Sequence, residues 1–191
     1  MPRKRTLKPR KQALVRAVPK YTPSPWQDAL HRNQAKRKWV WAGRRAGKGR
    51  AAIQEAISTI LEASQTKFIV NGNDVTDTLV PDIHIWTVAP TKAQMRQVWN
   101  EMKAYIPRYM WKDYSRAGGR GSCWHEDEYY VELEVRQPNG AFSPDTVRKS
   151  VLWELRSADN PETLQTVGLD FLHIAESQDV KQIAWDKVEW V

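Results

Sequence analysis

The sequence predicts an α/β domain with a mostly parallel sheet and helices on both faces. Two observations lead to this prediction. Apolar, strand-like runs alternate with amphipathic, helix-like runs along most of the chain, as expected for a parallel sheet covered by helices. A basic loop with three glycines, AGRRAGKG at 42–49, lies between one such strand-like run and a helical segment. A phosphate-binding loop requires this setting, so the fold class is that of a P-loop NTPase.

Composition indicates one folded domain preceded by a basic arm. Of the 30 Lys and Arg residues, eight lie within residues 1–20, which contain no acid, so the other 22 match the 22 Asp and Glu residues. We expect residues 1–20 to be a disordered arm that contacts phosphate backbones, or simply a solvated tail, and residues 21–191 to form the domain. The single cysteine excludes an internal disulfide, and no apolar run approaches the roughly 18 residues of a membrane span. These features favour a cytosolic protein without a membrane partner.

Capping residues, turn residues and periodicity place the individual elements. Ser24 and Pro25 are a typical N-cap and first helical residue, and Trp26 and Leu30 would share one face of that helix. The expected elements are, in order, a helix from Pro25, a short buried strand at 39–42, a helix at 49–64, a hairpin turn at 70–74, a strand at 83–90, a helix at 91–107, strands at 129–142 and 150–158, a connector or helical turn at 160–168, a strand at 170–177 and a helix at 179–191.

The loop at 42–49 matches the phosphate-binding (Walker A) pattern at every position but the last. That pattern is Gly or Ala, four residues, and then Gly-Lys followed by Ser or Thr; Ala42, Gly47 and Lys48 fit it. Consecutive backbone N–H groups at a helix start would cradle phosphates, and the lysine would reach the outermost ones. Gly49 stands where a hydroxyl side chain would bind Mg²⁺.

A second segment, DFLHIAES at 170–177, supplies the acidic half of such a site. It is an apolar run that ends in Glu176. In nucleotide hydrolases this strand usually ends in Asp-Glu, where the Asp orients the metal ion and the Glu activates the attacking water. The Asp position is Ala175 here, and His173 is expected to pack within the sheet. Taken alone, the segment could also be a core strand with a terminal acid.

Four segments together resemble the N-terminal ATPase domain of the large terminase subunit, the motor that packages DNA in tailed bacteriophages. SPWQDAL at 24–30 is similar to the family's adenine-binding segment, and AGRRAGKG has an arginine after the glycine, as terminase phosphate loops do. TVAPTKAQMRQVW at 87–99 is similar to the segment after the next core strand. The stretch at 153–177, which leads into the acidic strand, is the strongest match. Their order and spacing are more specific than any one segment.

The resemblance implies a role for each matching residue. Trp26 would stack on adenine and Gln27 would hydrogen-bond it. Arg44 would stabilise charge in the transition state as an arginine supplied in cis, and Arg45 would share that role or face DNA. Glu176 would polarise the attacking water. The expected nucleotide-binding loop residues are Gly43, Arg44, Arg45, Ala46, Gly47, Lys48 and Gly49, with Lys48 also neutralising the outer phosphates.

Two departures from the family pattern fall on the metal side. Gly49 lacks the hydroxyl, and Ala175 lacks the carboxylate, so the metal ligands are unknown from the sequence. Either Glu176, with Asp179 or Asp170 nearby, holds the Mg²⁺, or the site binds ATP and hydrolyses it poorly. A third departure is length. A coupling segment and a nuclease domain would follow in the family, so the resemblance implies an incomplete ATPase domain from a truncated or split reading frame.

The function implied is ATP-dependent packaging of double-stranded DNA into the capsid, with ATP and Mg²⁺ as cofactors. The implied partners are the DNA, a small terminase subunit, a portal protein and further copies in a homo-oligomeric ring, in the host cytoplasm and transiently at the procapsid. Two alternatives remain open: a helicase-type ATPase, and a non-catalytic nucleotide- or nucleic-acid-binding remnant of the fold. The acidic cluster at 123–128, CWHEDE, fits no zinc spacing and is expected to be a solvated loop.

Overall fold

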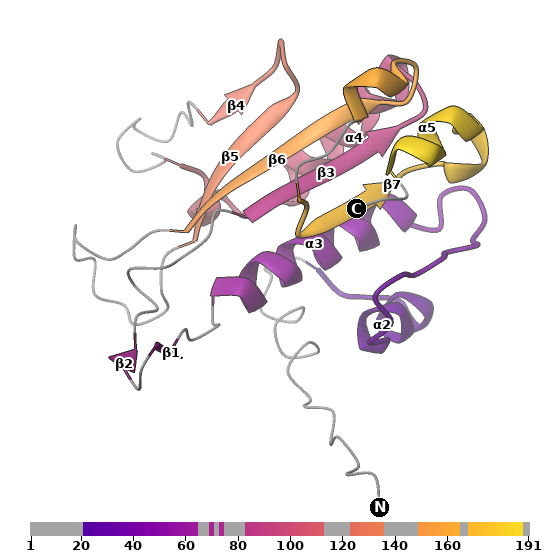
Figure 1. Cartoon of the computed structure of the whole chain (residues 1–191). Helices are drawn as coiled ribbons and strands as arrows, with labels where there is room; N and C mark the ends of the chain where they lie inside the picture. The colour runs from indigo at the N-terminus through magenta and orange to yellow at the C-terminus, as the bar shows by residue number, and fades with distance from the viewer. Residues whose placement is uncertain are drawn as a thin grey trace, which may run out of the picture.

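The computed structural model describes residues 21–64, 69–70, 73–74, 83–112, 123–135, 149–164 and 168–188. The basic arm expected at 1–20 lies outside the described residues. Figure 1 shows a sheet with helices packed along it. The helices are α2 (Pro25–Arg32), α3 (Lys48–Ser64), α4 (Lys92–Tyr105) and α5 (Gln182–Val188), with 3-10 turns η1 (Arg108–Met110), η2 (Pro161–Leu164) and η3 (Ser177–Asp179). The strands are β1 (Ile69–Val70), β2 (Asn73–Asp74), β3 (Ile83–Ala89), β4 (Trp124–His125), β5 (Tyr130–Val135), β6 (Lys149–Ser157) and β7 (Phe171–Ile174).

The main sheet has the strand order β4-β5-β6-β3-β7. Its central part is parallel, because β6 and β7 both pair in parallel with β3, on opposite sides of it. β5 and β4 extend the sheet in antiparallel fashion beyond β6. The carboxyl ends of β3, β6 and β7 therefore meet at one edge, where ligands bind in open α/β sheets.

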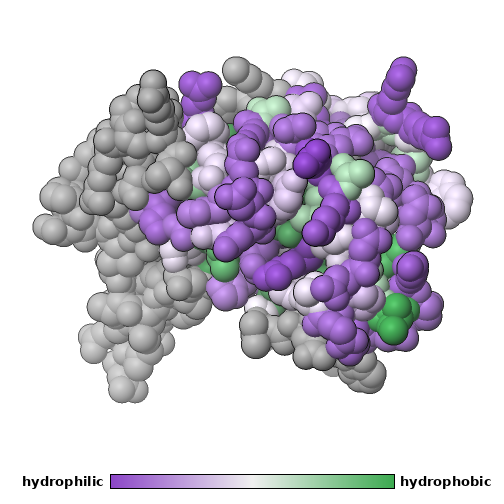
Figure 2. Space-filling view, turned by 90° about the horizontal axis from the view of Figure 1, so that it is seen from above, coloured by the Kyte–Doolittle hydropathy of each residue, from purple (hydrophilic) through white to green (hydrophobic). Residues whose placement is uncertain are grey.

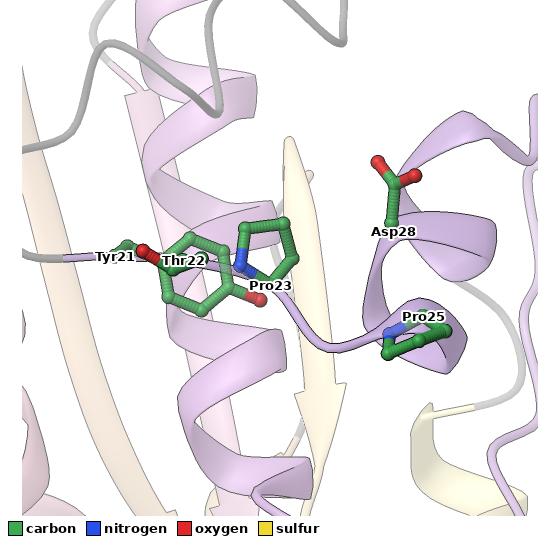
Figure 3. Close-up of a pocket in the computed structure, with 5 residues that line it drawn as sticks. All are labelled: Tyr21, Thr22, Pro23, Pro25 and Asp28. Atoms are coloured by element: carbon green, nitrogen blue, oxygen red, sulfur yellow. The ribbon is translucent and has the colours of Figure 1, made fainter.

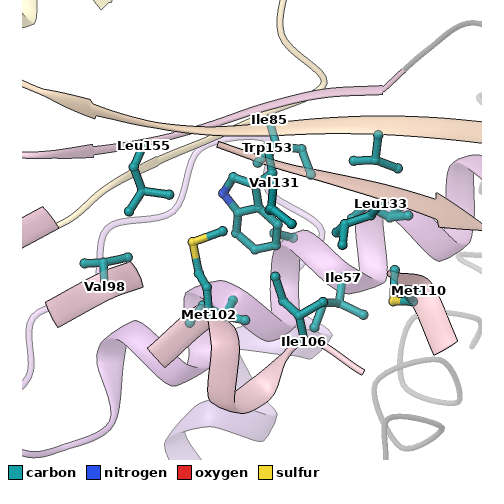
Figure 4. Close-up of a cluster of buried hydrophobic side chains, with 14 of the residues drawn as sticks. Ile57, Ile85, Val98, Met102, Ile106, Met110, Val131, Leu133, Trp153 and Leu155 are labelled. Carbon is teal, nitrogen blue, oxygen red and sulfur yellow. The ribbon is translucent and has the colours of Figure 1, made fainter. Parts of the chain in front are cut away.

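Alternation along β3 divides the interior into two layers. Ile83, Ile85 and Ala89 face a core shared with α3, α4, β5 and β6, whereas Trp86 and Val88 face a smaller core with α5 and η2. Trp153 of β6, fully buried, lies between the sheet and the helices of the larger core (Figure 4). Helices thus cover both faces, which confirms the predicted fold class.

Most of the expected elements are present within the described residues. The helix at 92–105 begins at the predicted cap, since the Thr91 hydroxyl accepts a hydrogen bond from the Gln94 backbone N–H. The predicted hairpin is confirmed by the antiparallel pairing of β1 with β2. The connector forms one 3-10 turn, and the last helix is present as α5. The expected strand continuation at 136–142 lies outside the described residues.

The predicted buried strand at 39–42 is wrong. These residues form no strand, and Trp39 and Trp41 are 77% and 101% exposed. A strand needs a neighbour to satisfy its backbone groups, and no strand of the described sheet pairs with this segment. The Trp39 ring instead lies against Trp185 of α5, with 5.6 Å between ring centres.

Few large apolar side chains are exposed elsewhere in the described part of the chain. The view from above is dominated by hydrophilic residues with small apolar patches (Figure 2). The exposed ones are Trp39, Val40, Trp41, Tyr109 and Ile183. Among the described helices, none is long and apolar enough to cross a membrane.

Candidate nucleotide site

The loop that precedes α3 has the backbone conformation of a tight, glycine-dependent turn. Arg45 and Gly47 both have positive φ angles, of 60° and 81°. At Gly47 a Cβ atom would lie 2.9 Å from Nε2 of Gln27, so a larger residue would be both strained and crowded there. The Ala51 N–H then bonds the Gly47 carbonyl at 3.0 Å, which starts the helix. The side chains of Arg44 and Arg45 are exposed.

Lys48 and Glu176 meet at the carboxyl edge of the sheet. Lys48 Nζ lies 3.9 Å from Glu176 Oε2 and donates a 3.0 Å hydrogen bond to the Ala42 carbonyl. Glu176 follows β7 in a left-handed conformation with φ 44°, and its carboxylate accepts a hydrogen bond from Gln178. The fold thus brings the lysine and the acid predicted from two distant motifs to one point. Both side chains remain partly open to solvent.

Helix α2 is tied to the phosphate loop by the side chain of Gln27. Its Oε1 accepts from the Ser24 N–H at 2.8 Å, and its Nε2 donates to the Gly47 carbonyl at 3.1 Å. A pocket of about 580 Å³ opens between the segment that precedes α2 and the first turn of that helix (Figure 3). The residues that line it are Tyr21, Thr22, Pro23, Pro25 and Asp28. Trp26 is partly buried and does not line this pocket.

The buried side of α2 is polar, unlike the apolar face expected at Trp26 and Leu30. Gln27 and His31 are the buried residues of this helix. His31 Nδ1 lies 2.6 Å from a carboxylate oxygen of Glu55 on α3, and His31 Nε2 lies 2.7 Å from the Tyr21 hydroxyl. The helix pattern did not indicate this, because the partners of these polar groups lie on other segments. Burial raises the pKa of the Tyr21 phenol to about 12.

Lys38 completes this polar cluster. Its ammonium group bonds the second carboxylate oxygen of Glu55 at 2.7 Å and the Leu30 carbonyl at 3.1 Å. The cluster of Tyr21, His31, Lys38 and Glu55, called the α2–α3 network below, therefore fixes α2 against α3. By doing so it holds Gln27 in reach of the phosphate loop.

On the metal side, the two usual ligands are absent and one other carboxylate is close. A Cβ atom built on Gly49 would lie 2.4 Å from Oε2 of Glu101, a residue of α4. Of the acids that we proposed as substitutes, Asp179 is exposed in η3 next to Glu176. Asp170 is excluded, because it lies at the opposite end of β7, where its carboxylate accepts from the His84 N–H at 3.0 Å. No cluster of three potential metal ligands occurs among the described residues. The segment at 123–128 is a solvated turn only in part, because Cys123 is buried and Trp124–His125 form β4, whereas residues 126–128 are exposed.

His173 lies on β7 opposite Thr87 of β3, within the sheet as expected. Burial lowers the pKa of its imidazole to about 4.

The folded pKa of His173 lies below the value near 6.5 in an unfolded chain, so the unfolded state takes up the proton first. The contribution of the neutral His173 imidazole to the free energy of unfolding is complete above pH 6.5 and is lost as the pH falls toward 4. We expect the free energy of unfolding to fall between pH 7 and pH 5, and to fall less in His173→Gln. Urea titrations of both proteins at the two pH values measure this, and equal losses would contradict the assignment to His173.

Comparison with solved structures identifies the fold. The Thermus phage P74-26 large terminase ATPase domain matches 88% of this chain with a TM-score of 0.60 and 22% sequence identity. A point mutant of that domain matches equally, with a TM-score of 0.62 at the same identity. The chain has the fold of a large terminase ATPase domain. It spans about 60% of the length of these two solved chains. No protein-family model and no curated protein sequence matches it.

The sequence analysis did not predict the residues of other helices that contact the predicted site residues. Glu101 lies 52 positions from Gly49 in a helix whose pattern indicates only an amphipathic surface. The one signal in the sequence was Gly49 itself, because a glycine at that loop position indicates that something else fills the space of the missing side chain. The α2–α3 network had no such signal.

Proposed function

We propose that this chain is the ATP-binding and ATP-hydrolysing domain of a DNA-packaging motor of the large terminase type. The observation that carries the proposal is the approach of Lys48 Nζ to Glu176 Oε2, at 3.9 Å. It lies at the end of a terminase-like sheet, beside a helix that begins in a glycine turn. A cation for phosphate and a carboxylate for water are the two groups that ATP hydrolysis needs at one place.

Each predicted residue keeps its role within this proposal. The loop amides from Gly43 to Gly49 bind the phosphates, and Lys48 exchanges its contact with Ala42 for the outer phosphates. Arg44 and Arg45 are exposed at the loop, so either can reach bound phosphate or DNA. Glu176 orients the attacking water.

The adenine lies on the α2 side of the loop in this proposal. Trp26 supplies a partly exposed ring there, and the pocket beside α2 lies next to it in sequence. Gln27 already uses both ends of its amide within the protein. Gln27 can therefore hydrogen-bond adenine only if ATP binding replaces one of these two bonds.

The residues at this edge offer one carboxylate ligand for Mg²⁺. Mg²⁺ is usually bound by one or two carboxylates together with substrate phosphates and water, and Glu176 offers one carboxylate at this edge. When bound, the ion would neutralise charge on the β- and γ-phosphates.

The partners follow from the same proposal. Double-stranded DNA, a small terminase subunit, a portal protein and further copies of the chain in a ring are the components of such a motor. It would work in the host cytoplasm and dock transiently at the procapsid. Within such a motor, this chain would carry out the ATP-binding and ATP-hydrolysing step.

The test is ATP binding and hydrolysis by the purified chain, with and without linear duplex DNA. We expect Lys48→Ala to lower ATP affinity by at least about 10-fold, because it removes the ammonium group that the proposal assigns to the outer phosphates. Binding is followed by tryptophan fluorescence and turnover by phosphate release. Lys181→Ala, which changes an exposed lysine just before α5, is the matched control. Unchanged binding in Lys48→Ala would refute the proposal.

The missing metal ligands favour a second function, which is nucleotide binding without hydrolysis. Gly49 and Ala175 remove a hydroxyl and a carboxylate together, and a protein that binds nucleotide without hydrolysing it needs neither. ATP binding without turnover, with or without DNA, would support this non-catalytic remnant of the fold. Stimulation by single-stranded but not double-stranded nucleic acid would favour the helicase-type ATPase.

A further inference from the structure

Gly49 faces the interior of the site. In α3 it lies one and two turns before Ile53, Ala56 and Ile57, which pack against the sheet and α4. Any side chain at position 49 would therefore leave the helix toward this interior, on the side of the loop where the usual hydroxyl binds metal.

A carboxylate already occupies that direction. Oε2 of Glu101 lies 2.4 Å and its Oε1 3.9 Å from the position of a Cβ on Gly49. Oε2 therefore stands where a serine or threonine would place its own side-chain atoms. The glycine and the glutamate are complementary: a Cβ at 49 would force Glu101 to move, and without Glu101 the space would be empty.

The rest of α4 holds Glu101 at this place. One turn further along, the Tyr105 ring lies 4.8 Å from the Arg50 guanidinium, which also lies 5.1 Å from the Tyr21 ring. Trp99 and Met102, on either side of Glu101, are buried in the main core. These contacts fix the rotation of α4, so the side chain of residue 101 starts from the face of α4 that lies toward Gly49.

Glu101 has no counter-ion in the part of the chain that the structure describes. Its carboxylate makes no hydrogen bond or ion pair with a described residue, although the side chain is only partly exposed. A cation bound at this point would supply the partner that this carboxylate lacks among the described residues.

We propose that Glu101 is a magnesium ligand of the nucleotide site and takes the place of the missing hydroxyl. This inference rests on the proposed function. The usual site has one neutral oxygen after the lysine and one carboxylate on the acidic strand. This chain lacks both, and Glu101 returns one negative charge to the metal side from α4. In this proposal Glu176, whose Oε2 lies 3.9 Å from Lys48 Nζ, supplies a second carboxylate, and Mg²⁺ commonly takes one or two carboxylates beside phosphate oxygens and water.

The test compares ATP affinity in Mg²⁺ and in EDTA for the wild type and for Glu101→Gln. Glutamine keeps the shape of the side chain and removes its charge. We expect the wild type to bind ATP more tightly in Mg²⁺, and Glu101→Gln to lose about 10- to 100-fold of that gain, while its ATP affinity in EDTA holds or rises. Mn²⁺ titration of the protein–ATP complex, followed by the EPR signal of free Mn²⁺, reports the ligand directly. Glu162→Gln, on the opposite face of the sheet, is the matched control.

A double variant tests the replacement itself. Gly49→Ser in the Glu101→Ala background supplies the usual hydroxyl and clears the space that a Cβ at position 49 needs, so part of the Mg²⁺ effect should return. Three results overturn the inference: an unchanged Mg²⁺ effect in Glu101→Gln, tighter ATP binding of this variant in Mg²⁺ and EDTA alike, which would make Glu101 a block to phosphate, or no recovery in the double variant. If the wild type binds no ATP in either condition, the proposed function fails together with it.

Discussion

Glu55→Ala is expected to cause the largest loss of stability of any single change in the α2–α3 network. Glu55 is 7% exposed, and its two carboxylate oxygens bind His31 and Lys38 at 2.6 and 2.7 Å. In Glu55→Ala the largely buried ammonium group of Lys38 would keep only the Leu30 carbonyl as a partner. The His31 imidazole would lose the carboxylate at its Nδ1. Removing one member of a buried ion pair costs about 3 to 5 kcal/mol, because the remaining charge is uncompensated.

For a domain of this size, that loss corresponds to a fall in Tm on the order of 10 °C. Thermal and urea unfolding measure it. Glu128→Ala is the matched control, since Glu128 is exposed in the turn between β4 and β5 and such changes stay within about 0.5 kcal/mol. An unfolding midpoint equal to that of the wild type would show that the network contributes nothing.

The same variant separates two roles of the network. If α2 detaches while the sheet stays folded, ATP affinity falls at temperatures where the circular dichroism of the helices is nearly unchanged, because Gln27 then leaves the Gly47 carbonyl. Coincident loss of binding and of secondary structure would instead show that α2 and α3 unfold as one unit with the core.

Local signals account for the parts of the structure that were predicted correctly. The cap at Thr91, the isoleucine spacing in α3 and the Asn-Gly pair before β2 act over a few residues, so their outcome is determined within the segment that contains them. The approach of Lys48 to Glu176 was predictable for a different reason. Glu176 follows β7 at the carboxyl edge of the parallel strands, where ligands bind in such sheets, and the family resemblance implied that the phosphate loop lies at that same edge, although residues 39–42 form no strand.

The errors arise where a residue depends on a partner elsewhere in the chain. Trp39 and Trp41 have the composition of a buried strand, but a strand forms only where another offers its edge. The buried face of α2 carries Gln27 and His31 because their partners come from the phosphate loop and α3. Glu101 was not predictable at all, since its position over Gly49 depends on how α4 crosses α3.

The second large effect is expected at Glu176. Glu176→Gln should lower the rate of ATP hydrolysis by about 10²- to 10⁴-fold, the usual contribution of a general base, because an amide cannot accept the proton of the attacking water. ATP affinity in EDTA should hold or rise, since the substitution removes a negative charge 3.9 Å from Lys48 Nζ. Single-turnover hydrolysis and equilibrium binding measure the two effects separately.

Glu128→Gln is the control for Glu176→Gln, because it removes an exposed carboxylate from the turn between β4 and β5, which has no role in the proposed site. Equal losses of rate in the two variants would mean that general negative charge, and not Glu176, drives hydrolysis. A loss of ATP affinity in Glu176→Gln in Mg²⁺ but not in EDTA would place Glu176 on the metal rather than on the water. Since Ala175 leaves the strand with a single acid, Glu176 can contact both the metal ion and the water. If the double variant Glu101→Gln, Glu176→Gln loses less ATP affinity in Mg²⁺ than the sum of the losses in the two single variants, the two glutamates hold the same ion.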